Sequence, residues 1–339
     1  MLNNFNLTKM LFMFMMIMST LFTLSSNSFM NMWMGMEINL ISFIPLMVNK
    51  FNNLSSQSMM KYFLIQSISS INFLFSSITI TYLNKWFYNL NYLNLLILMI
   101  LNLSLLMKMG AAPFHFWFPK TMKGLTWINC LILSTWQKII PMIILYNSCL
   151  MKIIFLSCIM SALIGSIMGL NQTSLILLMS YSSINHISWM LISLMMNFNL
   201  WMIYFFIYSF INFILMITFN KIKIFNLNQI FLNKMNLINY FILLNLLSLG
   251  GLPPFLGFLS KWMVINFLIN KFMYMLSILL VMTSLINLFF YIRMTYSYMM
   301  IKFNEIKFFS LKVEKSLTII LMNSLSIFNL VFITFIYII

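Results

Sequence analysis

The feature that most constrains the fold is a succession of apolar stretches, each about as long as a lipid bilayer is thick. A helix that crosses the hydrocarbon core needs about 20 mostly apolar residues. Hydrophobic residues make up 63% of the 339 positions, and charged residues make up only 6%. Because a soluble domain usually carries about a quarter charged residues, this balance indicates an all-α integral membrane protein.

Reading the chain for stretches of spanning length predicts eleven transmembrane helices. The connections between them are mostly short and rich in Asn, Lys and Ser, which predicts a single transmembrane domain over residues 1–339. The predicted spans are 9–26, 29–48, 62–83, 93–118, 125–147, 150–170, 174–194, 200–220, 237–268, 272–296 and 317–338.

The lysines outside these spans give the predicted orientation. If eleven spans alternate in direction, twelve loop lysines fall on the side of the N-terminus and three, Lys85, Lys152 and Lys271, on the other. The positive-inside rule then puts the N-terminus on the negative, matrix-like side and the C-terminus opposite. The net charge of +16 therefore reflects the loop lysines that orient the chain in the membrane. Basic residues dispersed over many loops argue against a nucleic-acid partner.

Two of the predicted spans contain clusters of helix-breaking residues. Proline removes a backbone donor, and clustered glycine loosens a helix further. The breaks lie five spans apart in helices of opposite direction, which predicts a transporter-like fold of two inverted five-helix units. The residues of the breaks are Gly110, Pro113, Gly250, Gly251, Pro253 and Pro254. The predicted units are 1–148 and 149–296, followed by a loop and a last helix in 297–339.

Four charged residues, Glu37, Lys108, Lys138 and Lys261, lie inside apolar runs. A charge at the bilayer centre costs about 2.5–3.5 kcal/mol on insertion scales, so such residues are rare and usually functional. A lysine removed from water gives up its proton more readily, which suits it to carry protons. The alternative is a static ion pair between helices. Since three lysines face one acid before Glu305, two of them would lack a fixed partner.

Two histidines and one arginine are weaker candidates. His186 lies in a polar segment of a predicted span and is a candidate proton relay or gate, with His115 a lesser one. The alternatives for both are a hydrogen-bonded packing residue and a haem ligand. Arg293, at the end of the tenth span, is interpreted as an interface anchor. Because no cysteine cluster and no glycine-rich nucleotide loop is visible, we expect no metal and no cofactor in this chain.

Several of these segments together resemble a known family in order and spacing. It is the subunit 2 family among the antiporter-like membrane subunits of mitochondrial NADH:ubiquinone oxidoreductase, respiratory complex I. The stretch Gly-x-x-Pro-Phe-His-Phe-Trp is specific to this kind of subunit. The segments that carry the resemblance are 33–39, 110–119, 124–127, 135–138, 169–173, 181–189 and 249–262.

The resemblance implies an antiporter-like fold and proton translocation driven by quinone reduction elsewhere in the complex. By carry-over, Glu37 and Lys108 form the ion pair of a first half-channel, Lys138 is a central relay, and Lys261 belongs to a second half-channel. The implied partners are other membrane-arm subunits, including neighbouring antiporter-like subunits, and lipids of the mitochondrial inner membrane. NADH, FMN, iron–sulfur clusters and ubiquinone would bind to other subunits.

The sequence departs from the family where relatives usually carry a basic pair, since Ile176 and Leu177 stand there. Two alternative functions share the same charged features. One is a stand-alone cation/proton antiporter, and the other is a structural membrane subunit with vestigial charges.

Overall fold

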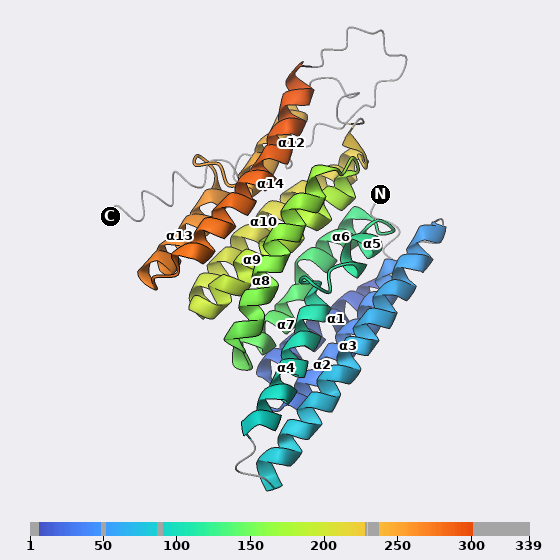
Figure 1. Ribbon diagram of the computed structural model, residues 1–339. Helices are drawn as coiled ribbons and strands as arrows, with labels where there is room; N and C mark the ends of the chain where they lie inside the picture. The colour runs from blue at the N-terminus through green and yellow to red at the C-terminus, as the bar shows by residue number, and fades with distance from the viewer. Residues whose placement is uncertain (1–6, 49–51, 87–90, 228, 230–236, 301–339) are drawn as a thin grey trace, which may run out of the picture. The chain divides into compact units, whose positions relative to one another are not determined.

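The computed structural model describes residues 7–48, 52–86, 91–227, 229 and 237–300, and the described chain is almost entirely helical (Figure 1). The helices are α1 (Leu7–Ser25), α2 (Phe29–Met47), α3 (Asn53–Trp86), α4 (Asn91–Met109), α5 (Trp117–Met122), α6 (Trp127–Ser134), α7 (Trp136–Asn147), α8 (Met151–Leu170), α9 (Leu175–Met196), α10 (Phe198–Ile222), α12 (Leu237–Gly250), α13 (Leu256–Asn270) and α14 (Tyr274–Met300). The chain divides into two compact units, Met1–Ser157 and Cys158–Ile339, with the division inside α8.

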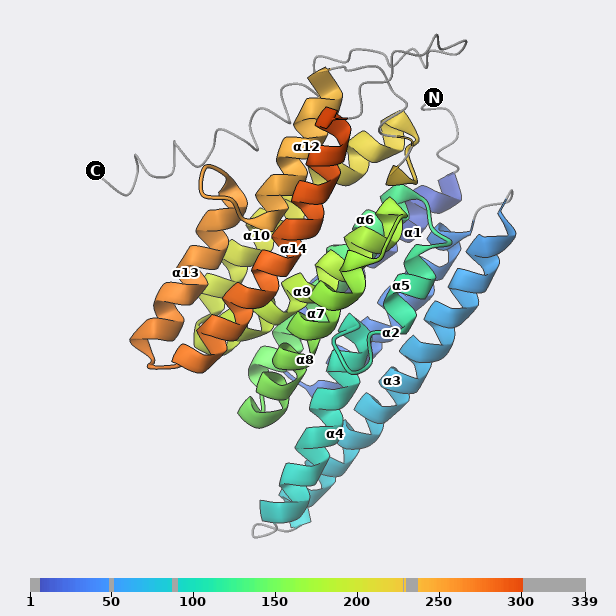
Figure 2. The ribbon, with the colours of Figure 1, turned by 45° about the horizontal axis from the view of Figure 1, so that its top comes forward.

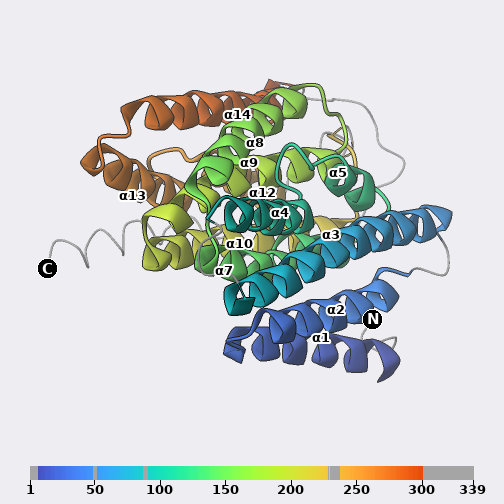
Figure 3. The ribbon, with the colours of Figure 1, turned by 60° about the horizontal axis from the view of Figure 1, so that its bottom comes forward.

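The first unit is built on two pairs of adjacent helices. Helices α1 and α2 form a hairpin, which Figure 3 shows side by side, and α3 runs along α4. Ser28 caps α2 by accepting a hydrogen bond from the backbone N–H of Asn31. Gly35 permits close packing of α2 on α1, since a side chain there would collide with Thr23. Helix α7 packs against both α4 and α1, so it lies in the interior of this unit.

The second unit is organised around α9, whose residues are buried along most of its length. This helix packs against α10, α13 and α14, and α12 in turn contacts α10, α13 and α14 (Figure 2). The serines of α9 donate to backbone carbonyls three residues earlier, as Ser182 does to Met179. Their hydroxyl groups are therefore satisfied within the helix even though they are buried.

The predicted all-α membrane architecture is confirmed. Within the described residues, seven helical stretches are long and apolar enough to cross a membrane, and three shorter apolar helices accompany them. The shorter ones, Asn94–Met109, Tyr240–Gly250 and Leu256–Asn270, belong to the two spans that were predicted to be broken. The predicted eleventh span, 317–338, lies outside the described residues. The division into inverted units at residue 148 stays a prediction.

Candidate functional site

The first helix break begins where α4 ends at Met109, as the glycine and proline cluster predicts. Gly110 adopts a φ of +73°, the left-handed conformation that glycine enters without steric cost. Its N–H donates to the carbonyl of Met107 at 3.2 Å, and the N–H of Ala111 donates to the carbonyl of Leu106 at 3.1 Å. This pair of bonds is the Schellman arrangement that closes the C-terminal end of a helix.

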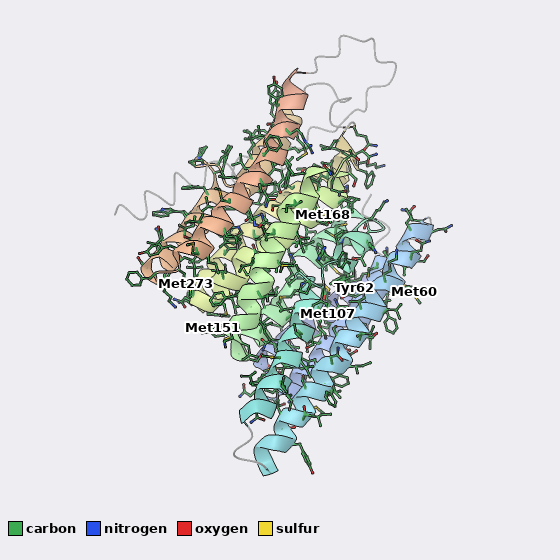
Figure 4. All side chains as sticks on the ribbon, in the orientation of Figure 1. Met60, Tyr62, Met107, Met151, Met168 and Met273 are labelled. Carbon is green, nitrogen blue, oxygen red and sulfur yellow. The ribbon has the colours of Figure 1, made fainter. Side chains whose placement is uncertain are left out.

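Side chains from two other helices satisfy further carbonyls at this end of α4. The Nε2 of Gln66, on α3, donates to the carbonyl of Lys108 at 3.1 Å. The indole Nε1 of Trp117, on α5, donates to the carbonyl of Met107 at 3.0 Å. Figure 4 labels Met107 on α4 and Tyr62 on α3. The broken helix therefore ends inside the apolar chain without leaving these acceptors unpaired.

Lys108 occupies the last turn of α4, where the helix dipole favours a positive charge. Its side chain is 8% exposed, and its Nζ donates to the sulfur of Met36 at 3.4 Å. Glu37, on the partly exposed side of α2, acts on the Lys108 ammonium electrostatically. The structure therefore brings the two residues of the predicted pair into the same region, at a separation beyond a direct ion pair.

An amide pair that the sequence interpretation missed lies next to Lys108. Asn39 on α2 and Gln137 on α7 bind each other reciprocally: Asn39 Nδ2 donates to Gln137 Oε1 at 3.0 Å, and Gln137 Nε2 donates to Asn39 Oδ1 at 3.1 Å. The hydroxyl of Tyr62 also donates to Gln137 Oε1, at 3.4 Å. Asn39 and Gln137 lie far apart in the sequence, so no local pattern predicts that they bind each other. The sequence shows only that each is an amide within an apolar run.

Lys138 follows an interruption that the sequence interpretation also missed. Helix α6 ends at Ser134 and α7 begins at Trp136, with Thr135 between them at φ −116° and ψ −70°. The Thr135 hydroxyl donates to the carbonyl of Leu131 at 2.7 Å, a bond that is known to bend helices. Lys138 therefore lies in the first turn of α7 rather than in the middle of an unbroken span.

The Lys138 side chain is among the most deeply buried in the described part of the protein. It is 1% exposed, and its Nζ lies 5.4 Å from the centroid of the Phe118 ring. An ammonium over an aromatic face is stabilised by the quadrupole of the ring. Because Phe118 follows the first break and lies in the first turn of α5, the segment after the break also supplies part of the surroundings of Lys138.

The second break repeats the geometry of the first within the second unit. Helix α12 ends at Gly250, and Gly251 adopts a φ of +86°. The N–H of Gly251 donates to the carbonyl of Ser248 at 3.1 Å, and the N–H of Leu252 donates to the carbonyl of Leu247 at 3.5 Å. The chain then begins α13 at Leu256.

Lys261, on α13, binds directly to the end of α12. Its Nζ donates to the carbonyl of Gly250 at 2.7 Å and to the carbonyl of Leu249 at 3.3 Å. The side chain is 6% exposed, and the ammonium lies 5.9 Å from the centroid of the Trp189 ring. The cation thus faces the negative end of the α12 dipole.

These positions give a physical reason for the unequal placement of the two lysines in sequence. Lys108 precedes its break and Lys261 follows its own. In space, each carries its charge at the C-terminal end of the half-helix before the break. At both breaks, one carbonyl of the last helical turn that the backbone bonds of the turn do not use accepts a hydrogen bond from a side chain. The carbonyl of Lys108 accepts from Gln66, and the carbonyl of Leu249 accepts from Lys261.

His186 lies on α9 in a group of aromatic hydroxyls. Its Nδ1 is 2.8 Å from the hydroxyl oxygen of Tyr204, and its ring centroid is 4.9 Å from that of Tyr208. His115 is buried in the first break, with its ring 4.2 Å from that of Phe116. Arg293 donates to the carbonyl of Leu170, the last residue of α8, at 2.7 Å.

None of these groups resembles a metal centre. Among the described residues, no group of three or more His, Cys, Asp or Glu side chains could hold a metal ion. Cys130 and Cys158 are free and buried, and Cys149 is free and partly buried. The arrangement supplies buried ammonium groups, which are able to release protons, and hydroxyls and amides, which are able to orient water.

Known proteins share this sequence and architecture. Residues 26–287 match the transmembrane family described as NADH:quinone oxidoreductase/Mrp antiporter. The NADH-ubiquinone oxidoreductase chain 2 of Anopheles gambiae is 47% identical over 338 residues, which cover 97% of this chain and 98% of the relative.

Solved structures show the same fold at low sequence identity. A chain of respiratory complex I from Thermus thermophilus has a TM-score of 0.83 at 19% identity, covering 96% of this chain and 79% of that one. A chain of an Mrp complex from a Dietzia species has a TM-score of 0.75 at 14% identity, covering 84% of this chain and 59% of that one. The chain therefore belongs to the NADH:quinone oxidoreductase/Mrp antiporter transmembrane family and, within it, to the NADH-ubiquinone oxidoreductase chain 2 proteins.

Proposed function

We propose that this chain translocates protons as a membrane subunit of respiratory complex I, and that Glu37, Lys108, Lys138 and Lys261 carry out the transfer. The observation that carries the proposal is the burial of three lysines, two of them at the ends of broken helices. Buried ionisable residues inside a membrane usually mark an ion pathway. The family to which the chain belongs supports the same conclusion.

In this proposal the four charged residues act in sequence. The opposite charges of Glu37 and Lys108 attract each other through space, so a proton that leaves Lys108 changes the electrostatic interaction between the two residues. Lys138 serves as the middle stage, and Lys261 with His186 serves the second unit. Moving one charge across 100 mV costs about 2.3 kcal/mol. This free energy is within the range by which coupled buried groups change each other's charge state.

The proposal extends to the setting of the chain. The energy comes from NADH oxidation and ubiquinone reduction in other subunits, which hold FMN and the iron–sulfur clusters. The partners are other membrane-arm subunits, including antiporter-like neighbours, together with lipid. The chain lies in the mitochondrial inner membrane, with its N-terminus on the matrix side and its C-terminus in the intermembrane space, in accordance with the distribution of its loop lysines.

The test replaces single lysines in the intact complex. We expect Lys108→Met and Lys138→Met each to reduce NADH-driven proton pumping several-fold while leaving the assembled complex intact, because methionine keeps the length and removes the ammonium. The matched control is Lys152→Met, since Lys152 is exposed near the start of α8. Pumping is measured in reconstituted vesicles and assembly by native electrophoresis. Undiminished pumping in both buried variants would contradict the assigned roles.

A stand-alone cation/proton antiporter is the second candidate, because the Mrp complex shares the fold. The same native gel separates the two functions. We expect the chain to migrate with a large NADH-oxidising assembly. Migration without that assembly would favour the antiporter.

A further inference from the structure

A small cavity lies beside Lys108, between α2, α3, α4 and α7. Its volume is about 20 Å³, and its polar lining comes from Asn39, Tyr62, Gln66, Lys108 and Gln137. A single water molecule needs roughly 10–15 Å³ of such space and two to four polar partners. The cavity therefore has the size and the chemistry to hold one water.

The amide pair at this cavity has its hydrogen bonds distributed unevenly. Gln137 uses both ends: its Oε1 accepts from Asn39 and Tyr62, and its Nε2 donates to Asn39 and, at 3.7 Å, to the sulfur of Met16. Asn39 uses one of its two N–H groups and one of its two lone pairs in this pair. Gln137 is thus held rigidly, while Asn39 retains a donor and an acceptor for a further partner.

Lys108 also has donors to spare. Among the described residues its Nζ donates to the sulfur of Met36, which is a weak acceptor. A buried ammonium has three N–H groups and is costly unless they are hydrogen-bonded.

The cavity wall also includes Pro141, which has no N–H to offer the carbonyl of Gln137 one turn earlier.

We propose that this cavity binds one water molecule, which accepts from the Lys108 ammonium and is oriented by Asn39. Gln137 holds Asn39 in place, so both amides act as positioning residues. The inference rests on the proposed function, because it gives the Lys108 proton a first step. An N–H bond of Lys108 breaks as an O–H bond forms on the water. The water then releases one of its original protons to a second water outside the cavity, so it is regenerated and no electron is gained or lost.

The amide pair at the cavity also lies next to Lys138 in the chain. Gln137 immediately precedes Lys138, so the amide pair fixes the first turn of α7 relative to α2 and to the cavity. Loss of the pair would remove the amide groups that orient the water while leaving both lysine side chains chemically unchanged. The amide pair should therefore matter for proton transfer beyond its contribution to stability.

The first experiment locates the water in the unsubstituted complex. In a map that resolves ordered waters, we expect a density peak in the cavity at about 3 Å from Lys108 Nζ and from an Asn39 amide atom. A map with well-defined waters elsewhere in the unit and none in this cavity would overturn the proposal. This measurement does not depend on whether a variant assembles.

The second experiment changes the amides in the intact complex. We expect Gln137→Met and Asn39→Leu each to lower the proton-pumping rate several-fold and to alter its solvent deuterium isotope effect. The double variant Asn39→Gln with Gln137→Asn keeps both amides with their lengths exchanged, and we expect it to recover most of the rate. The matched control is Asn129→Leu, which removes another buried amide that bonds to α2, at the carbonyl of Leu46, away from the cavity.

The outcomes separate this inference from the proposed function. If the lysine variants lose pumping while the amide variants keep the normal rate and isotope effect, the water site is overturned and the function stands. If Lys108→Met and Lys138→Met both pump normally, the function itself fails. If Asn129→Leu lowers the rate and alters the isotope effect as much as Asn39→Leu, the amide pair has a merely structural role.

Discussion

Gly251 is a residue whose lack of a side chain leaves room for the charged side chain of Lys261. Its φ of +86° is left-handed, and a methyl group there would come within 3.0 Å of Lys261 Cδ and Nζ. We expect Gly251→Ala to cost about 1–2 kcal/mol from the backbone alone, and to displace Lys261 as well. The measurement is the thermal stability and pumping rate of the solubilised complex.

Gly250→Ala provides the control for this prediction. Gly250 is the last residue of α12 and has no positive φ, and a methyl group there would meet Tyr291 at 3.3 Å. We expect a small effect on stability, because alanine favours a helix and the tyrosine ring needs to yield by only a few tenths of an ångström. Equal losses in the two variants would contradict the role of the left-handed turn.

Burial of the charged residues could be predicted from sequence, but their contacts could not. The apolar runs around Lys108, Lys138 and Lys261 predict buried side chains, and all three are nearly inaccessible. The acceptors of Lys261 lie 11 and 12 residues earlier in the chain. That approach depends on how the break turns α13 back onto α12, which no local pattern determines.

At the scale of elements, the two half-helices of the second break pack backbone against backbone. A Cβ on Gly257, in the first turn of α13, would collide with the carbonyl group of Ser248 on α12. We therefore expect Gly257→Ala to push α13 away from α12 and to destabilise the subunit by about 1–3 kcal/mol, the usual cost of overpacking. Assembly yield and thermal inactivation of the complex measure the effect.

Ser260→Ala is the matched change on the same helix. The Ser260 hydroxyl donates to the Gly257 carbonyl at 3.0 Å, a bond within one turn. Its removal leaves the contact between α12 and α13 unchanged, so we expect at most a small loss of stability. A loss of stability as large as that of Gly257→Ala would contradict the assignment of the Gly257 effect to close packing against Ser248.

Breaks in helices were predictable where proline and glycine cause them, as at Gly110 and Gly251. The interruption at Thr135 was missed because threonine is tolerated within helices. Its bend comes from a side-chain bond to Leu131, and Pro141 removes a donor one turn after Gln137. A hydroxyl residue placed a few positions before a proline, beside a buried lysine, is the sequence pattern that indicates such an interruption.

At the scale of the whole molecule, the orientation in the membrane is the prediction open to a direct test. The lysine distribution predicts a matrix-side N-terminus. An antibody to the N-terminal residues should therefore bind inverted submitochondrial particles and fail to bind intact mitoplasts. The control is an antibody to a matrix-facing subunit, which reports leakage. Binding of this antibody to mitoplasts alone would contradict the predicted topology and place the N-terminus on the opposite side.

Lys261, which is proposed to carry protons, also joins α13 to the end of α12 through its hydrogen bonds. Hydrogen bonds from an ammonium are roughly twice as strong as those from a neutral donor. When Lys261 is protonated it holds the carbonyls of Leu249 and Gly250, and with them α12, firmly against α13. If Lys261 gives up its proton, as the proposed function requires, hydrogen bonds from the neutral amine to these carbonyls would be weaker. Under the proposed function, proton occupancy at Lys261 would therefore also change how strongly the two halves of the broken helix are joined, whereas the neutral Gln66 holds its carbonyl with constant strength.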